Sequence, residues 1–168
     1  MDKVIDKLSA YNIFTNLFPG VVYCFVATKL FGLSLVPEDL VVAAFLYYFC
    51  GMVISRVSSV VVEPLMSKSG FVTYADYGDY VAASNTDKFI GQLLETSNSY
   101  RSVVALVICL LGTGAWTEAV TRWSAFGAVS HYVLLAALLV LFSFAFRKQT
   151  QYITKRVALN KQGGDAES

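Results

Sequence analysis

The chain has 168 residues, of which 56% are hydrophobic and only 15% are charged, and its formal net charge at pH 7 is +1. Soluble domains carry about 25% charged residues, so this composition indicates a membrane protein. The near-neutral charge gives no general basic patch, so we expect no direct binding of nucleic acid. The length suits one domain over residues 1–168. Three cysteines lie in apolar segments, where a free thiol behaves as a small hydrophobe, and they predict no disulfide framework.

Four apolar segments are candidates for crossing a bilayer, which requires roughly 20 apolar residues per helix, and most of them are long enough. They cover residues 17–36, 40–62, 103–117 and 126–146. Lys3 and Lys7 precede the first segment as in a signal peptide, but no small-residue cleavage site follows, so we expect a retained first span. The third segment reaches spanning length when it is extended to residues 100–120, and a re-entrant segment is the alternative. The predicted fold class is an all-α integral membrane protein with four transmembrane helices and helical cytoplasmic extensions.

The distribution of basic residues predicts the orientation of these spans. With four spans, ten Lys and Arg residues fall on the side of the two termini and two fall on the opposite side. Both termini are therefore expected in the cytoplasm. The inner connection 67–99 and the tail 147–168 lie on the same side and carry most of the mass outside the membrane.

The inner connection is predicted to form two helical pieces, one over 76–83 and one that begins at Asp87 with Asn85 or Thr86 as its cap. The tail is expected to continue the fourth span as a helix. Tyr77, Tyr80, Phe89 and Leu93 form a possible partner surface on this side. The alternatives are packing against the tail helix and an amphipathic helix that lies in the plane of the membrane.

The second span carries two predicted sites. Gly51, Ser55 and Ser59 recur at every fourth position and predict a helix-packing face, since small residues allow close approach of helices in lipid. The contact lies either within one bundle or between subunits. Arg56, Ser59 and Glu63 form a predicted intramembrane polar site, because a charge inside a span costs about 2.5–3.5 kcal/mol on insertion scales. Arg56 either extends to the interface and pairs with Glu63 or backbone carbonyls, or it lines a polar cavity or pore.

Motifs of catalysis and metal binding are missing from the sequence. We find no zinc-protease, nucleophile-elbow or phosphate-loop motif and no paired intramembrane aspartates. The single histidine has no second ligand beside it. We therefore expect no enzyme activity, no catalytic residue, no cofactor and no metal.

Several segments together resemble a family of small four-span bacterial membrane proteins, and the resemblance covers most of the chain. That family is in turn similar to the membrane components of bacterial anti-phage systems, Kiwa among them, in which a membrane protein acts beside a soluble partner. The resemblance implies a multi-pass protein of the bacterial inner membrane and brings no activity, ligand or catalytic residue with it. The segments are residues 8–14 running into Phe18, Pro19 and Gly20, then residues 47–56, 62–65, 74–77 and 98–101.

These observations lead to a functional hypothesis with one alternative. The chain is expected to be a homo-oligomeric inner-membrane scaffold, sensor or effector that contacts membrane lipid and works with a cytoplasmic protein partner, in the setting of phage defence. The alternative is a channel or small transporter whose polar route is lined by Arg56.

Overall fold

The computed structural model describes the backbone of residues 2–165 and the side chains of residues 15–161. This part of the chain is helical and contains no strand. Three of its helical stretches are long and apolar enough to cross a membrane, namely Leu40–Lys68, Phe89–Arg122 and Ser124–Lys161. The apolar part of the first helix, Thr15–Phe31, is shorter, so the count of four spans stays a prediction. The elements are α1 (Asp2–Phe31), α2 (Leu40–Val57), the π-helical turn η1 (Ser58–Val62), α3 (Glu63–Lys68), α4 (Tyr77–Thr86), α5 (Phe89–Arg122) and α6 (Ser124–Asp165).

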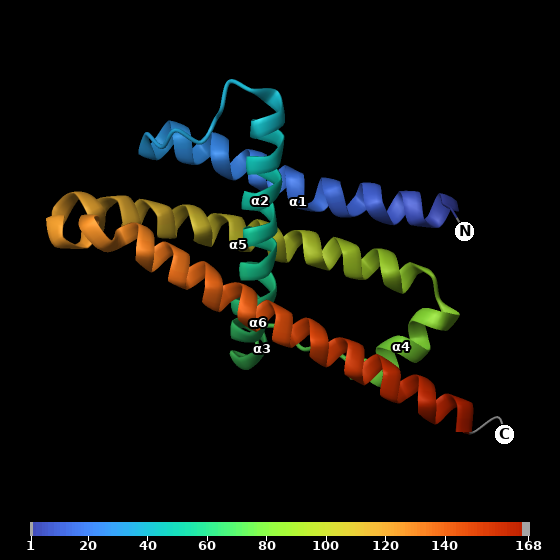
Figure 1. Ribbon diagram of the computed structural model, residues 1–168. Helices are drawn as coiled ribbons and strands as arrows, with labels where there is room; N and C mark the ends of the chain where they lie inside the picture. The colour runs from blue at the N-terminus through green and yellow to red at the C-terminus, as the bar shows by residue number, and fades with distance from the viewer. Residues whose placement is uncertain (1, 166–168) are drawn as a thin grey trace.

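Helices α1, α5 and α6 extend in broadly the same direction, whereas α2 crosses them (Figure 1). The beginning of α1, the helix α4 and the end of α6 lie toward the right of Figure 1, and the turn between α5 and α6 lies at the opposite end. The sequence led us to expect four helices side by side, and the crossing of α2 differs from that expectation. Membrane helices tilt by about 20° on average from the bilayer normal. A helix that crosses the others steeply therefore differs from the usual arrangement of neighbouring spans.

Several predicted boundaries need correction. The first helix ends at Phe31 and not at residue 36, because Gly32 adopts a positive φ of 69°, which ends helices readily. The residue at the cap of α5 is Lys88, and not Asn85 or Thr86, and its side chain forms no capping bond. The carboxylate of the preceding Asp87 accepts a hydrogen bond from the Phe89 N–H at 2.8 Å. The third and fourth apolar segments are confirmed as parts of uninterrupted helices that include the inner extensions, so α5 contains no re-entrant turn.

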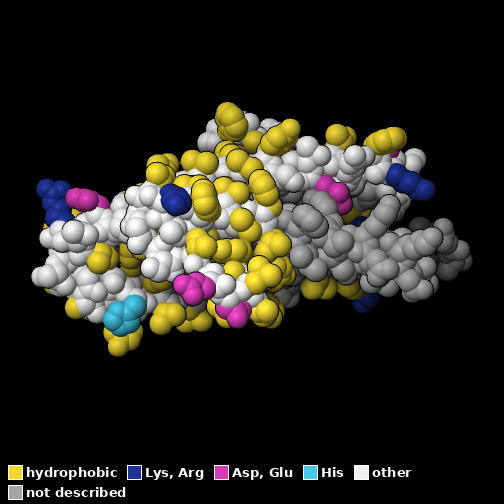
Figure 2. All heavy atoms as spheres, turned by 90° about the horizontal axis from the view of Figure 1, so that it is seen from above, with side chains coloured by type: hydrophobic (Ala, Val, Ile, Leu, Met, Phe, Trp, Pro, Cys, Tyr) yellow, Lys and Arg dark blue, Asp and Glu magenta, His cyan; other side chains and the backbone are white. Residues whose placement is uncertain are grey.

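The described part of the protein buries few large side chains. Its core cluster is formed by Ile54, Val62, Ala105 and Leu106, where α2 and η1 meet α5. Most other large apolar side chains are exposed, and Figure 2 shows many of them on one face. Soluble monomers rarely expose contiguous apolar patches above a few hundred Å², whereas this pattern is typical of surfaces covered by lipid or by other subunits.

Candidate functional site

The site begins with a break in regular helix geometry at the end of α2. In an α-helix, the N–H of each residue bonds to the carbonyl four positions before it. Here the N–H of Glu63 bonds to the carbonyl of Ser58, five positions back, which defines the π turn η1. Such turns are rare and are frequently found at functional sites.

Pro64 explains why this turn leaves one carbonyl free. In the π pattern the carbonyl of Ser59 would accept a hydrogen bond from residue 64, but proline has no N–H. The Ser59 carbonyl instead accepts a hydrogen bond from the Lys148 Nζ of α6, at 2.6 Å. A local feature of the sequence thus provides an acceptor for a side chain that is 89 residues away along the chain.

Glu63 gathers two cations from two other helices. Its Oε1 lies 2.6 Å from the Nζ of Lys148, and its Oε2 pairs with a guanidinium nitrogen of Arg101 on α5. Arg101 also donates through its Nε to the hydroxyl of Ser58, at 3.0 Å. We call Ser58, Ser59, Glu63, Arg101 and Lys148 the charged joint, because they connect the end of α2 with α5 and α6.

The charged joint is shielded from solvent without being fully buried. The side chains of Glu63, Arg101 and Lys148 are 18%, 20% and 25% exposed, and Ser58 is 1% exposed. Ion pairs in such surroundings are screened less than those on an open surface. Since each charged group has more than one partner, the joint is a network and not a single salt bridge.

A cavity of about 850 Å³ adjoins the charged joint on the side of α4 and the tail. The ring of Tyr152 lies 5.9 Å from the Nζ of Lys148 and 5.8 Å from the ring of Tyr77, measured between centroids for the ring pair. Burial raises the pKa of Tyr152 and the negative charge of Glu63 raises that pKa further, so this phenol stays protonated. The cavity wall also includes Tyr74, Tyr80, Asn98 and Lys155.

Arg56 lies in a different pocket from Glu63. The Arg56 pocket, of about 230 Å³, is formed between α1, the end of α2 and α5. Among the described residues, no hydrogen bond or ion pair joins Arg56 to Ser59 or Glu63. The structure therefore separates two members of the predicted polar site, and Ser59 lies beside both. Every described residue that lines this pocket is polar: Thr15, Asn16, Ser55, Arg56, Ser58, Ser59, Asn98, Arg101 and Ser102.

The predicted packing face is divided in a similar way. Gly51 lies against α1, where a Cβ added to it would collide with the carbonyl oxygen of Asn16, and a Cβ on Gly20 would collide with the carbonyl of Tyr47. The two helices therefore cross with their backbones in close approach. Ser55 lies farther along α2 and Ser59 lies in η1, and both line the Arg56 pocket.

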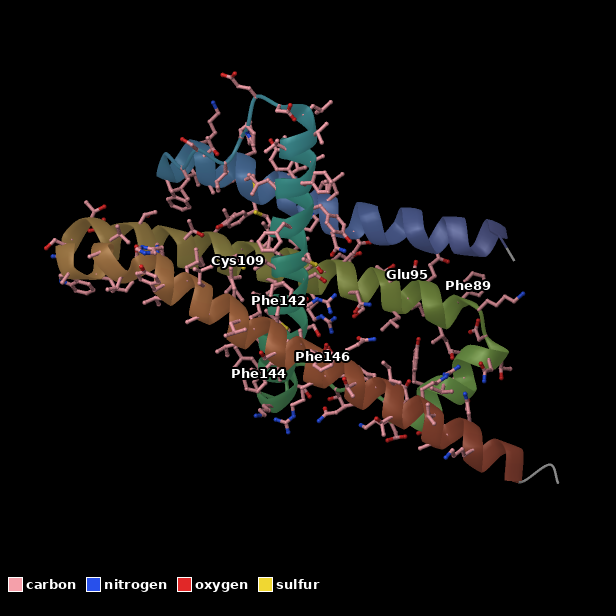
Figure 3. The ribbon with its side chains drawn as sticks, in the orientation of Figure 1. Phe89, Glu95, Cys109, Phe142, Phe144 and Phe146 are labelled. Carbon is pink, nitrogen blue, oxygen red and sulfur yellow. The ribbon has the colours of Figure 1, made fainter. Side chains whose placement is uncertain are left out.

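The predicted partner surface also separates into two parts. Tyr77 and Tyr80 line the cavity next to the charged joint. Phe89 and Leu93 are 71% and 68% exposed, so they do not pack against the tail in this chain. Phe89 lies at the beginning of α5, and Glu95 lies farther along the same helix (Figure 3).

Arg101, Lys148, Ser58 and Tyr152 are the site residues that the sequence reasoning did not select. A usable signal was present for the two cations, since each lies at the predicted inner end of its span, as Glu63 does. A search for opposite charges at the same predicted depth of the membrane would have paired these two cations with Glu63. Within the described residues, no group of three His, Cys, Asp or Glu side chains is placed to hold a metal ion.

No protein-family model, curated protein or solved structure matches this chain.

Proposed function

We propose that this protein is a homo-oligomeric scaffold or sensor of the bacterial inner membrane, and that its charged joint couples the spanning helices to a cytoplasmic platform. The platform consists of α4, the first turns of α5 and the tail part of α6. The observation that carries the proposal is the pairing of Glu63 with both Arg101 and Lys148. A displacement of α2 would act on both helices that extend into the platform.

The exposed face of α5 supports a cytoplasmic partner in this proposal. Phe89 and Leu93 are one helical turn apart and largely exposed. Apolar anchors at this spacing are the usual way in which a helix binds a partner. The resemblance to membrane components of anti-phage systems adds phage defence as the proposed setting.

Photocrosslinking in bacterial cells tests the proposal. A photoreactive residue at Phe89 or Leu93 should give an adduct with one discrete soluble protein, together with adducts between copies of the chain. Leu40 is 83% exposed at the start of α2 and serves as the control position. Glu63→Gln should reduce the adduct yield at Phe89 at equal expression. Identical adducts from Leu40, or a yield that Glu63→Gln leaves unchanged, would contradict the proposal.

A channel or small transporter is the second candidate, and the polar character of the residues described in the Arg56 pocket favours it. In this version Arg56 lines a route for water or anions between the helices. Ion flux into liposomes that contain the purified protein tests it. Flux that is abolished by Arg56→Gln and retained in Arg122→Gln, a change at the last residue of α5, would favour the channel over the scaffold.

A further inference from the structure

The Arg56 pocket combines positive charge with an absence of acidic groups in its described lining. Two of its side chains are arginines, and the remainder are hydroxyls and amides. The other cavities around the charged joint include Glu63 in their walls, and the largest one includes Asp76 as well. The Arg56 pocket is therefore the most selective of them for an anion.

The two arginines differ in how their charge is compensated. Arg101 directs one nitrogen to Glu63 and another to the hydroxyl of Ser58. Arg56 forms no hydrogen bond or ion pair with any residue whose side chain the structure describes. A guanidinium offers five N–H donors, so Arg56 adds a positive charge without a partner among the described side chains to a wall that also contains Arg101.

We infer that the Arg56 pocket binds a phosphate group. Guanidinium groups match the oxygens of phosphate with paired hydrogen bonds, and Ser and Asn side chains commonly complete such a shell. An anion placed between Arg56 and Arg101 would also relieve the repulsion between the two like charges. The inference does not depend on the proposed scaffold function, since it concerns only the occupant of this pocket.

The size of the pocket agrees with this occupant. A volume of about 230 Å³ corresponds to roughly seven or eight water molecules, at about 30 Å³ each in the liquid. One tetrahedral oxyanion with a few bound waters fits within that volume. The phosphate belongs either to a soluble ion from the cytoplasm or to the headgroup of a phospholipid, and both offer the same chemistry to the arginines.

The experiment uses the full-length protein in nanodiscs and has two arms. In the first arm, inorganic phosphate is titrated at constant ionic strength into protein in phosphatidylcholine nanodiscs, and binding is followed by calorimetry. In the second arm, native mass spectrometry compares the lipids retained from phosphatidylglycerol and phosphatidylcholine. Saturable phosphate binding identifies a soluble ion. Selective retention of phosphatidylglycerol identifies a headgroup.

Variants decide whether the binding belongs to this pocket. Arg56→Gln should weaken binding about tenfold or more, which corresponds to about 1.4 kcal/mol. Arg156→Gln removes the same charge from an exposed position of the tail and should have no effect. Asn98→Asp places a carboxylate of nearly the same shape in the wall and should also weaken binding, so the test survives if Arg56→Gln does not fold. Absence of binding in both arms, or equal losses in Arg56→Gln and Arg156→Gln, would overturn the inference.

Discussion

Replacing Glu63 by glutamine removes the negative charge from the charged joint while nearly preserving the shape of the side chain. Arg101 and Lys148 would then lie near one another without a carboxylate between them. Each cation retains one neutral acceptor, the hydroxyl of Ser58 for Arg101 and the carbonyl of Ser59 for Lys148. The loss of stability is therefore smaller than the loss that would follow if a buried charge were left without any partner.

The exposure of the three side chains sets the expected magnitude. Fully exposed ion pairs contribute about 0.2–1 kcal/mol, whereas removing one partner of a buried pair costs about 3–5 kcal/mol. With exposures of 18–25% and two pairs broken at once, we expect Glu63→Gln to lower the free energy of unfolding by about 1–3 kcal/mol.

Denaturant titration in mixed micelles measures this loss, and Glu95→Gln provides the matched control. Glu95 is exposed on α5 (Figure 3) and takes part in no ion pair among the described residues, so its change should stay within about 0.5 kcal/mol. A double-mutant cycle with Arg101→Met should give a coupling energy above about 0.5 kcal/mol. Equal stability of the two glutamine variants, together with an additive cycle, would refute the joint as a stabilising network.

Three further predictions concern other parts of the chain. Gly51→Ala should destabilise the protein by about 1–3 kcal/mol in micelle unfolding, because the new Cβ meets backbone, whereas Gly112→Ala, which meets nothing within 4 Å, should be neutral or slightly stabilising. Arg56→Met and Glu63→Gln should be additive in the same assay without phosphate, because no hydrogen bond or ion pair joins the two side chains; a large coupling energy would contradict this separation. A cysteine introduced at Ser84 should resist an impermeant thiol reagent in intact cells and react after permeabilisation, as the charge bias requires; reaction from outside would reject the proposed topology.

The sequence was sufficient for the long helices because apolar length is a local property. The runs in α5 and α6 could be read directly, and their continuation into polar flanks followed from helical spacing. The crossing of α2 could not be read in this way. It depends on the meeting of Gly20 with Gly51 and on the π turn, and neither feature says by itself which helix will be contacted.

The site was predictable only in part for a related reason. Glu63 and Ser59 were among the polar positions that the sequence indicated, but their partners were sought on the same helix. A π turn alters which residues share a face after it, so a spacing argument that assumes regular helix fails at Glu63. The missing partners came from α5 and α6, where Arg101 and Lys148 looked like ordinary interfacial cations.

The Arg56 pocket and the cavity beside α4 both include Arg101 in their walls, which leads to a final prediction. This side chain lies in the wall of the Arg56 pocket and also pairs with Glu63, so a phosphate group and the carboxylate would compete for one guanidinium. Linkage requires that such competition act in both directions. Glu63→Gln should therefore strengthen phosphate binding by roughly fivefold or more, the lower end of ordinary coupling between sites, while Glu95→Gln should leave it unchanged. Bound phosphate should in turn weaken the Glu63–Arg101 contribution in the unfolding cycle. If Glu63→Gln binds phosphate no more tightly than the unaltered chain, the two sites are independent and the charged joint does not respond to the pocket.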